Sequence, residues 1–173
     1  QVVRGTAEVL APSEKISHIR QEHMPSIRID DKHERYLNLL ASVKGLEPIP
    51  TAVAHPCDVE SLKGPVIAFQ EGIIEPFLIG PESKIRSVAE EFGIDLHGIR
   101  IVNSKHSHDS AALAVSMVRT GDAEALMKGS LHTDELMSEV VSRANGLRTS
   151  RRISHVFVMN VPTYHRPLLI TDA

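Results

Sequence analysis

One stretch of sequence shows the repeating unit of the fold: Ala123-Glu124-Ala125-Leu126-Met127-Lys128-Gly129-Ser130-Leu131-His132-Thr133. Its first five residues are mostly apolar and predict a short buried strand, and Gly129 then permits a tight turn. Thr133 is of a residue type that caps helices, and the apolar residues after it recur at helical spacing until Asn145-Gly146 ends the pattern. The stretch therefore predicts one strand followed directly by one helix.

The same alternation of apolar runs and helical patterns fills the preceding part of the chain. The predicted segments are strands at 51–55, 74–79 and 99–102, and helices at 58–72, 81–93 and 110–119. Asp58 is the expected cap of the first helix, and Pro65 is a candidate point of division inside it. Because the strands are continuously apolar, they are typical of a parallel sheet that is covered on both faces. We predict an α/β fold: an open, mostly parallel sheet with helices on both faces.

The residues before this region predict a short strand and a linker helix. Residues 2–10 alternate well enough for a strand, and a helix is expected from Asp31 to Gly45. Pro48 and Pro50 follow, hold the backbone extended and exclude a helix. We therefore expect a domain boundary here, with residues 1–45 before it and residues 46–173 after it.

The two ends of the sequence indicate a segment of a longer polypeptide. The chain begins with Gln1 rather than Met, and residues 1–10 lack the charged-then-apolar layout of a signal peptide. Two further strands are predicted at 153–161 and 168–170, and the last, expected to be buried, runs almost to Ala173. A chain that stops at a buried strand is expected to continue.

The amino-acid composition excludes several classes of protein. The 173 residues include 19 Lys and Arg, 22 Asp and Glu and 42% hydrophobic residues, with a net charge of −3. These values argue against a disordered chain and against a basic nucleic-acid-binding surface. No apolar run approaches the length of a membrane helix, and Cys57 alone can form neither an internal disulfide nor a Cys-based zinc site. We expect a cytoplasmic protein.

The turn between residues 128 and 133 is the strongest candidate site. In open parallel sheets, ligands bind at the carboxyl ends of the strands, where helices begin. Lys128 supplies a positive charge, Ser130 and Thr133 supply hydroxyl donors, and the free N–H groups of the helix start can bind an anion. A phosphate or phosphoryl site is one interpretation. The other is a plain capped helix start, because Asp134 and Glu135 already satisfy the helix dipole.

A second polar loop, at residues 103–110, offers two histidines. His106 and His108 are of a type that binds metals, but no third ligand lies nearby in sequence, so a solvated loop is the alternative and no metal is expected. Ser107 and Ser110 lack the Gly-x-Ser-x-Gly turn of a nucleophile.

Three other features have structural explanations. His155 lies in an apolar run and fits a hydrogen-bonded core histidine, whereas Cys57, close to the expected site edge, fits a buried inert thiol. The acid-free run Arg148 to Arg152 can attract a phosphorylated cofactor or can form a solvated loop.

Several separate segments resemble the phosphate acetyltransferase and phosphate butyryltransferase family. They span residues 51–56, 74–81, 121–129, 152–157 and 169–173. The resemblance covers about residues 46–173, in order and without large gaps. Residues 5–12 resemble the end of a MaoC-type hot-dog hydratase domain. The combination is similar to bifunctional proteins that join an enoyl-CoA hydratase domain to a phosphate acyltransferase domain, although no hydratase activity is expected of this chain.

The resemblance implies reversible acyl transfer between coenzyme A and phosphate. It implies half of an isocitrate/isopropylmalate dehydrogenase-like architecture, in which the active site lies between two α/β domains and the second supplies arginine and acidic residues. The catalytic residues of this chain are therefore unknown. The residues that the resemblance assigns to phosphate or acyl phosphate binding are Lys128, Gly129, Ser130, His132, Thr133 and Asp172.

Coenzyme A or acyl-CoA and phosphate or acyl phosphate are the expected partners, with no bound cofactor, no nucleic acid and no membrane. The resemblance also implies a homodimer. The alternative function is a non-catalytic module that senses acyl-CoA or assembles a larger enzyme. That alternative remains open at the level of sequence, because the residues of a second domain would decide it.

Overall fold

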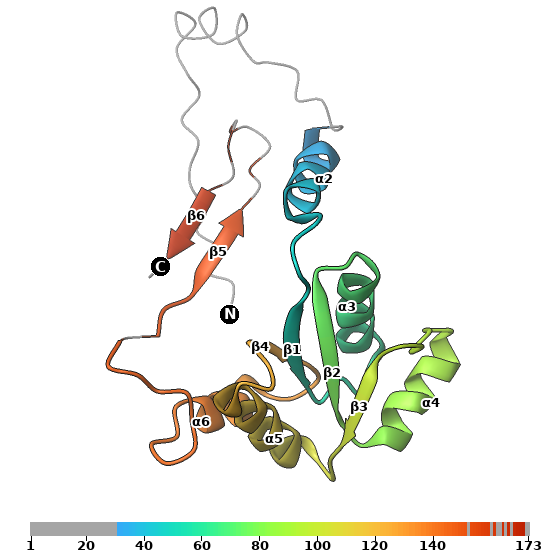
Figure 1. Ribbon diagram of the computed structural model, residues 1–173, viewed down its shortest axis with the longest axis vertical. Coiled ribbons are helices and arrows are strands. Elements are labelled where there is room, and N and C mark those ends of the chain that lie inside the picture. Colours follow the sequence, from blue (N-terminus) through green and yellow to red (C-terminus); the bar gives the residue numbers. More distant parts are fainter. Residues whose placement is uncertain are drawn as a thin grey trace, which may run out of the picture. The chain divides into compact units, whose positions relative to one another are not determined.

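The computed structural model describes residues 31–151, 153–159, 161, 164, 166 and 168–171 (Figure 1). Its contacts divide the chain into two units, residues 38–155 and a second unit formed by the residues before and after that range. The predicted strand at 2–10, the hydratase-like segment at 5–12 and Asp172 lie outside the described residues. No helix of the described part is long and apolar enough to cross a membrane.

The larger unit contains a four-stranded parallel sheet, which confirms the predicted fold class. Its strands are β1 (Ile49–Ala54), β2 (Ile74–Gly80), β3 (Arg100–Asn103) and β4 (Ala125–Lys128). Their order in the sheet is β3-β2-β1-β4. In the register of the sheet, Ala54 is paired with both Ile79 and Lys128, so the strands end at one common edge.

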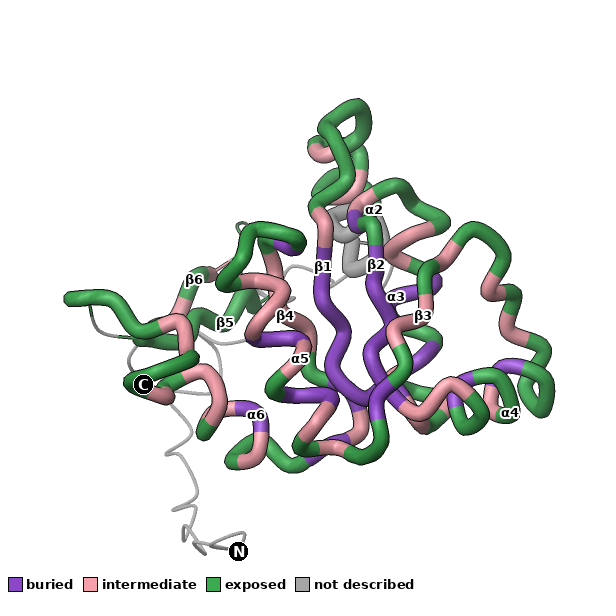
Figure 2. Tube along the Cα trace, turned by 60° about the horizontal axis from the view of Figure 1, so that its bottom comes forward, coloured by how far each residue is buried: buried purple, intermediate pink, exposed green. Residues whose placement is uncertain are grey.

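Two helices cover each face of this sheet. They are α3 (Val59–Gln70), α4 (Glu82–Phe92), α5 (Ser107–Thr120) and α6 (Thr133–Val140). Successive strand residues point to opposite faces, so Ala52 and Ala54 pack with α5 and α6 while Val53 packs with α3 and α4. The buried residues follow β1 and β2, the two central strands (Figure 2).

Prolines are accommodated where their missing N–H costs little. Pro65 lies inside α3 without dividing it, and Gly64 before it has no Cβ to clash with the proline ring. Pro76 lies in the central strand β2, but β3 pairs with β2 only from Phe77 onward. Pro76 therefore lies outside the β2–β3 ladder. Inside that ladder, its missing N–H would leave a hydrogen bond unmade.

Two predicted helix starts differ from the structure. Helix α5 begins three residues earlier than predicted, because His106 is its N-cap and the Nδ1 atom of His106 accepts a hydrogen bond from the backbone N–H of Asp109 at 3.3 Å. Helix α6 has His132 rather than Thr133 at the N-cap, and no side chain caps it. Thr133 is instead its first helical residue. The Asp58 cap of α3 is confirmed, and Ser61 completes a capping box.

The remaining elements are the helix α2 (Asp31–Val43) and an antiparallel pair, β5 (Val156–Met159) and β6 (Leu168–Thr171). The strand predicted at 153–161 corresponds to the shorter β5, and all four of its residues are exposed. The last strand, predicted as buried, is β6, in which two of the four residues are exposed. His155 is also exposed and precedes β5, so it is not a core histidine. An apolar run predicts a strand. Burial of that strand also requires other residues packed against it, and within the described part of the chain β5 has no such covering layer.

Candidate functional site at the carboxyl edge of the sheet

The carboxyl ends of the four parallel strands bring polar residues together. His55 follows β1, Ser104 follows β3, and the predicted loop follows Lys128 at the end of β4. Gly80 ends β2, and its backbone oxygen accepts a hydrogen bond from the N–H of Ser104 at 3.1 Å. Because ligands of open parallel sheets bind at this edge, it is the candidate site.

His55 has a strained backbone. Its φ angle is 58°, in the left-handed region that residues other than glycine rarely adopt, at a cost of about 1–3 kcal/mol. The carbonyl oxygen of His55 accepts three hydrogen bonds at 2.9 Å, from the N–H of Cys57 and from both the N–H and the Oγ–H of Ser130. The loop after β4 therefore holds His55 in this conformation.

Gly129 allows this close contact between the two chain segments. A Cβ atom at Gly129 would lie 2.5 Å from the backbone oxygen of Ala54 and 2.6 Å from that of His55. The N–H of Gly129 also donates to Ala54 at 2.8 Å. The sequence predicted a tight turn here, and the structure gives the reason as a close approach of two backbones.

The side chain of His55 belongs to a buried hydroxyl network. Its Nδ1 atom lies 3.0 Å from the Oγ of Ser110, which in turn lies 2.7 Å from the Oγ of Ser104. The Ser110 hydroxyl also donates to the carbonyl of His106 at 2.9 Å. Ser110 is fully buried, so it orients His55 and is not exposed to react as a nucleophile.

The surroundings of His55 favour its neutral form. Burial is the largest cause that lowers the pKa of His55, and the charges of Lys84 and His106 lower it further. The carboxylate of Glu135 acts in the opposite direction and raises the pKa. The net direction is downward, so His55 is neutral near neutral pH.

Of the predicted binding residues, Lys128 to Thr133 lie at this edge in two different roles. The backbone of Gly129 and the hydroxyl of Ser130 support His55, whereas His132 and Thr133 are exposed at the start of α6. The ammonium group of Lys128 donates to the carbonyl of Leu131 at 2.8 Å, on the same loop. Their assignment to phosphate binding stays a prediction.

Glu135 was treated in the sequence only as a partner of the helix dipole. Its Oε1 atom lies 3.5 Å from the Nε2 of His108, and its Oε2 is the one buried side-chain polar atom without a partner in the described part of the chain. His106 pairs instead with Asp109, at 3.4 Å. No group of three potential metal ligands occurs among the described residues.

Cys57 lies beside the site as a half-buried thiol. Burial raises the pKa of Cys57, and the charge of Lys84 opposes this only in part. The thiol is therefore protonated near neutral pH, and its predicted inert role stays a prediction. Asn103, at the end of β3, accepts a hydrogen bond through its Oδ1 from the N–H of Glu82 at 3.0 Å, which ties β3 to the start of α4.

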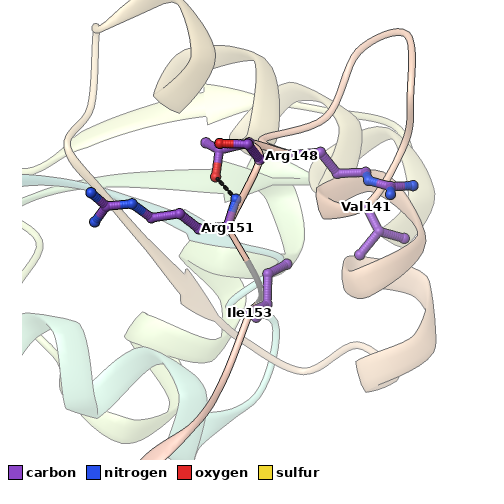
Figure 3. Close-up of a pocket in the computed structure, with 6 residues that line it drawn as sticks. Val141, Arg148, Arg151 and Ile153 are labelled. Atoms are coloured by element: carbon purple, nitrogen blue, oxygen red, sulfur yellow. Dashed lines mark hydrogen bonds between the residues drawn. The ribbon is translucent and has the colours of Figure 1, made fainter.

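The arginine run forms part of a separate pocket of about 530 Å³ (Figure 3). The residues that line it are Val141, Arg148, Thr149, Ser150, Arg151 and Ile153. The backbone N–H of Arg151 donates to the Oγ1 of Thr149 at 3.1 Å, while the side chains of Arg148 and Arg151 extend away from each other (Figure 3). The two guanidinium groups are therefore not arranged as a clamp on one phosphate.

Similar structures define the class of fold. A phosphotransacetylase from Staphylococcus aureus matches 79% of this chain and 49% of its own, with a TM-score of 0.58 and 13% identity. A branched-chain phosphotransacylase from Enterococcus faecalis matches 72% of this chain and 42% of its own, with a TM-score of 0.50 and 20% identity. The chain has the α/β fold of one part of the phosphotransacylases.

Sequence relatives then identify the family, although no family model matches the sequence. A phosphate acetyltransferase of Rhizobium meliloti is 55% identical over 139 residues, and one of Rickettsia prowazekii is 47% identical over 166 residues. A phosphate butyryltransferase of Clostridium acetobutylicum is 34% identical over 134 residues. These matches cover 80%, 96% and 78% of this chain. The chain belongs to the phosphate acetyltransferase and phosphate butyryltransferase family.

The chain spans about half the length of the curated relatives that it matches, 44% of the Rhizobium protein and 47% of the Rickettsia prowazekii protein. The latter match takes in 96% of this chain, so most of residues 1–45 align with a phosphate acetyltransferase as well. The hydratase-like head and the domain boundary at residue 46 stay predictions.

Proposed function

We propose that this chain forms part of an enzyme that transfers acyl groups reversibly between coenzyme A and phosphate. The observation that carries the proposal is the identity of 47–55% to proteins named phosphate acetyltransferase, over 80–96% of the chain. Coenzyme A and acyl phosphate are the proposed substrates, and a cytoplasmic homodimer is the proposed form.

The reaction defines what a site must supply. The thiol of coenzyme A loses its proton, and the sulfur attacks the carbonyl carbon of the acyl phosphate. The new C–S bond forms as the C–O bond to phosphate breaks, and phosphate leaves with the electron pair. Such a reaction needs a proton acceptor for the thiol and hydrogen-bond donors for the developing oxyanion.

The loop after β4 is the proposed phosphate-binding part of the site. Lys128 supplies the positive charge, and the backbone and hydroxyl of the exposed Thr133 supply donors at the start of α6. Ser130, Gly129 and His132 complete the predicted set in this loop. Asp172, the other predicted binding residue, lies outside the described residues. Glu135 in the first turn of α6 opposes an anion, so Lys128 is the residue on which phosphate binding depends most.

The test is thioester formation from coenzyme A with acetyl phosphate or butyryl phosphate. It is run on the 173-residue chain and on the natural full-length protein that carries it. Turnover by the full-length protein supports the proposal, and comparison of the two acyl phosphates gives the acyl preference. Binding of acyl-CoA without turnover by either protein would contradict it and favour the acyl-CoA-sensing alternative.

A further inference from the structure

We propose that Arg148 and Arg151 bind the phosphate groups of coenzyme A, in the pocket that follows helix α6. This inference rests on the proposed function and assigns the nucleotide end of one of its substrates to residues of this chain. The pocket has a volume of about 530 Å³, which lies in the usual range of small-molecule sites. None of its lining residues belongs to the loop at 128–133.

The pocket carries positive charge that no carboxylate balances. Its lining includes two arginines and no Asp or Glu, and no Asp or Glu occurs in residues 140–171. Arg86 and Arg100, elsewhere in the chain, form ion pairs with glutamates. Within the described part of the chain, Arg148 and Arg151 form none. Because arginine binds phosphate through charged hydrogen bonds, the expected ligand is a phosphorylated anion.

The directions of the two side chains select among phosphorylated ligands. The side chains of Arg148 and Arg151 extend away from each other (Figure 3), so a ligand with a single phosphate reaches only one of them. Acyl phosphate is such a ligand. Coenzyme A has a 3′-phosphate and a 5′-diphosphate on different positions of one ribose, and the two groups can each meet one guanidinium. Of the two proposed substrates, coenzyme A therefore fits this pocket.

The remaining lining suits the other parts of a nucleotide. Val141 and Ile153 form an apolar part of the pocket, and their side chains are 40% and 60% exposed. Apolar side chains of this kind can pack against the face of an adenine ring. The Oγ1 atom of Thr149 accepts a hydrogen bond from the N–H of Arg151 at 3.1 Å. The hydroxyl proton of Thr149 has no acceptor within the described residues, so it is available to the ligand.

Helix α6 joins this pocket to the loop that we propose binds acyl phosphate. The helix begins at Thr133, beside that loop, and its C-cap is Val141 of the pocket. Its eight residues span about 12 Å. The reacting thiol of coenzyme A stands at the end of the long, flexible pantetheine arm, away from the nucleotide. The arm can therefore bring the thiol to the loop while the nucleotide is held after α6.

The test replaces each arginine by Gln in the natural full-length protein and compares coenzyme A with dephospho-coenzyme A, which lacks the 3′-phosphate. Both side chains are exposed, so the variants are expected to fold. In each, KM for coenzyme A is expected to rise about 10-fold, because a charged hydrogen bond is lost, and KM for acyl phosphate is expected to stay unchanged. With dephospho-coenzyme A, the arginine that binds the 3′-phosphate is expected to have no effect. Arg143→Gln, at an exposed position in the same acid-free segment but outside the pocket, is the matched control.

Calorimetric titration with coenzyme A gives a readout that does not depend on turnover, and its Kd is expected to rise by the same factor as KM. Wild-type Kd and KM in both variants would overturn the inference. So would equal effects on coenzyme A and dephospho-coenzyme A in both variants. A lower Tm with unchanged Kd would show that the arginines only stabilise the C-terminal end of α6.

Failure of the proposed function gives a different result. Absence of turnover by the wild-type protein would overturn the acyl transfer reaction. Coenzyme A binding that the two arginine substitutions weaken, and Arg143→Gln does not, would in that case still support this pocket.

Discussion

The Nδ1 atom of His55 lies 3.0 Å from the Oγ of Ser110, although the two residues are 55 positions apart in the chain. The contact joins the end of β1 to the first turns of α5, and Ser110 carries it on to Ser104 after β3. Three segments of the sheet edge thus meet in one buried polar network. Such a network is stabilising only while every member is satisfied.

Replacement of Ser110 by Ala is expected to destabilise the protein by about 1–3 kcal/mol, because it leaves His55 Nδ1 and the Ser104 hydroxyl without their buried hydrogen-bond partner. Urea unfolding measures the change. Ser116→Ala, in the same helix, is the matched control and is expected to change stability by less than about 0.5 kcal/mol. Equal effects of the two substitutions would mean that the network contributes nothing to stability.

Replacement of Gly129 by Ala is expected to cost about 2–3 kcal/mol, because the new Cβ would overlap the backbone oxygens of Ala54 and His55. Gly72→Ala is the control: Gly72 has a φ of 72° but open space around it, so only backbone strain of about 1–2 kcal/mol is expected. Thermal or urea unfolding compares the two. A smaller loss at Gly129 than at Gly72 would contradict the close approach seen here.

Stability is expected to fall as the pH is lowered through the ordinary pKa range of histidine, in part through His55. Its pKa is lowered in the folded protein by burial first and by Lys84 next, so the unfolded chain binds this proton more readily. The contribution is complete above about pH 6.5, the pKa in the unfolded chain, and is lost as the pH falls below it.

Urea unfolding at pH 7.5 and pH 5.5 checks this pH dependence, with His55→Asn as the comparison. The variant has no titrating group at this position, so its loss of stability between the two pH values is expected to be smaller than that of the wild type. An equal loss in both proteins would assign the dependence to other groups. Asp58 does not interfere in this window, because its pKa is lowered from 3.8 by the hydrogen bonds from Ser61.

The sequence was sufficient for the fold because each strand-to-helix unit is encoded locally. Apolar runs gave the four strands, and residues such as Asp58 and Gly93 marked helix ends. The exposure of β5 could not be predicted, because an apolar pattern does not say whether a second layer is present. The predicted helix start at Thr133 was off by one residue for a similar reason: backbone geometry at His132, rather than a capping side chain, sets it.

The candidate site was predicted only in part. The loop from Lys128 to Thr133 stood out because Gly, Lys and hydroxyl residues between a strand and a helix suit anion binding. His55 and Glu135 did not stand out, because their environment arises from segments that are distant in sequence and meet only in the folded chain. A histidine at the end of the strand predicted at 51–55 was the available signal, and its positive φ angle was not visible in the sequence.

Replacement of Lys128 by Met tests the proposed phosphate-binding loop. Methionine keeps most of the length of the side chain and removes its charge, and the hydrogen bond from Lys128 to Leu131 is lost with it. If Lys128 binds phosphate, KM for acyl phosphate is expected to rise about 10-fold or more, since a charged hydrogen bond contributes about 1.5–3 kcal/mol, while KM for coenzyme A changes much less. Steady-state kinetics of the natural full-length protein measure both.

Lys105→Met, at an exposed position in the other polar loop, is the control and is expected to leave both values unchanged. An equal rise in KM for both substrates after Lys128→Met would indicate that Lys128 supports the loop and does not bind phosphate.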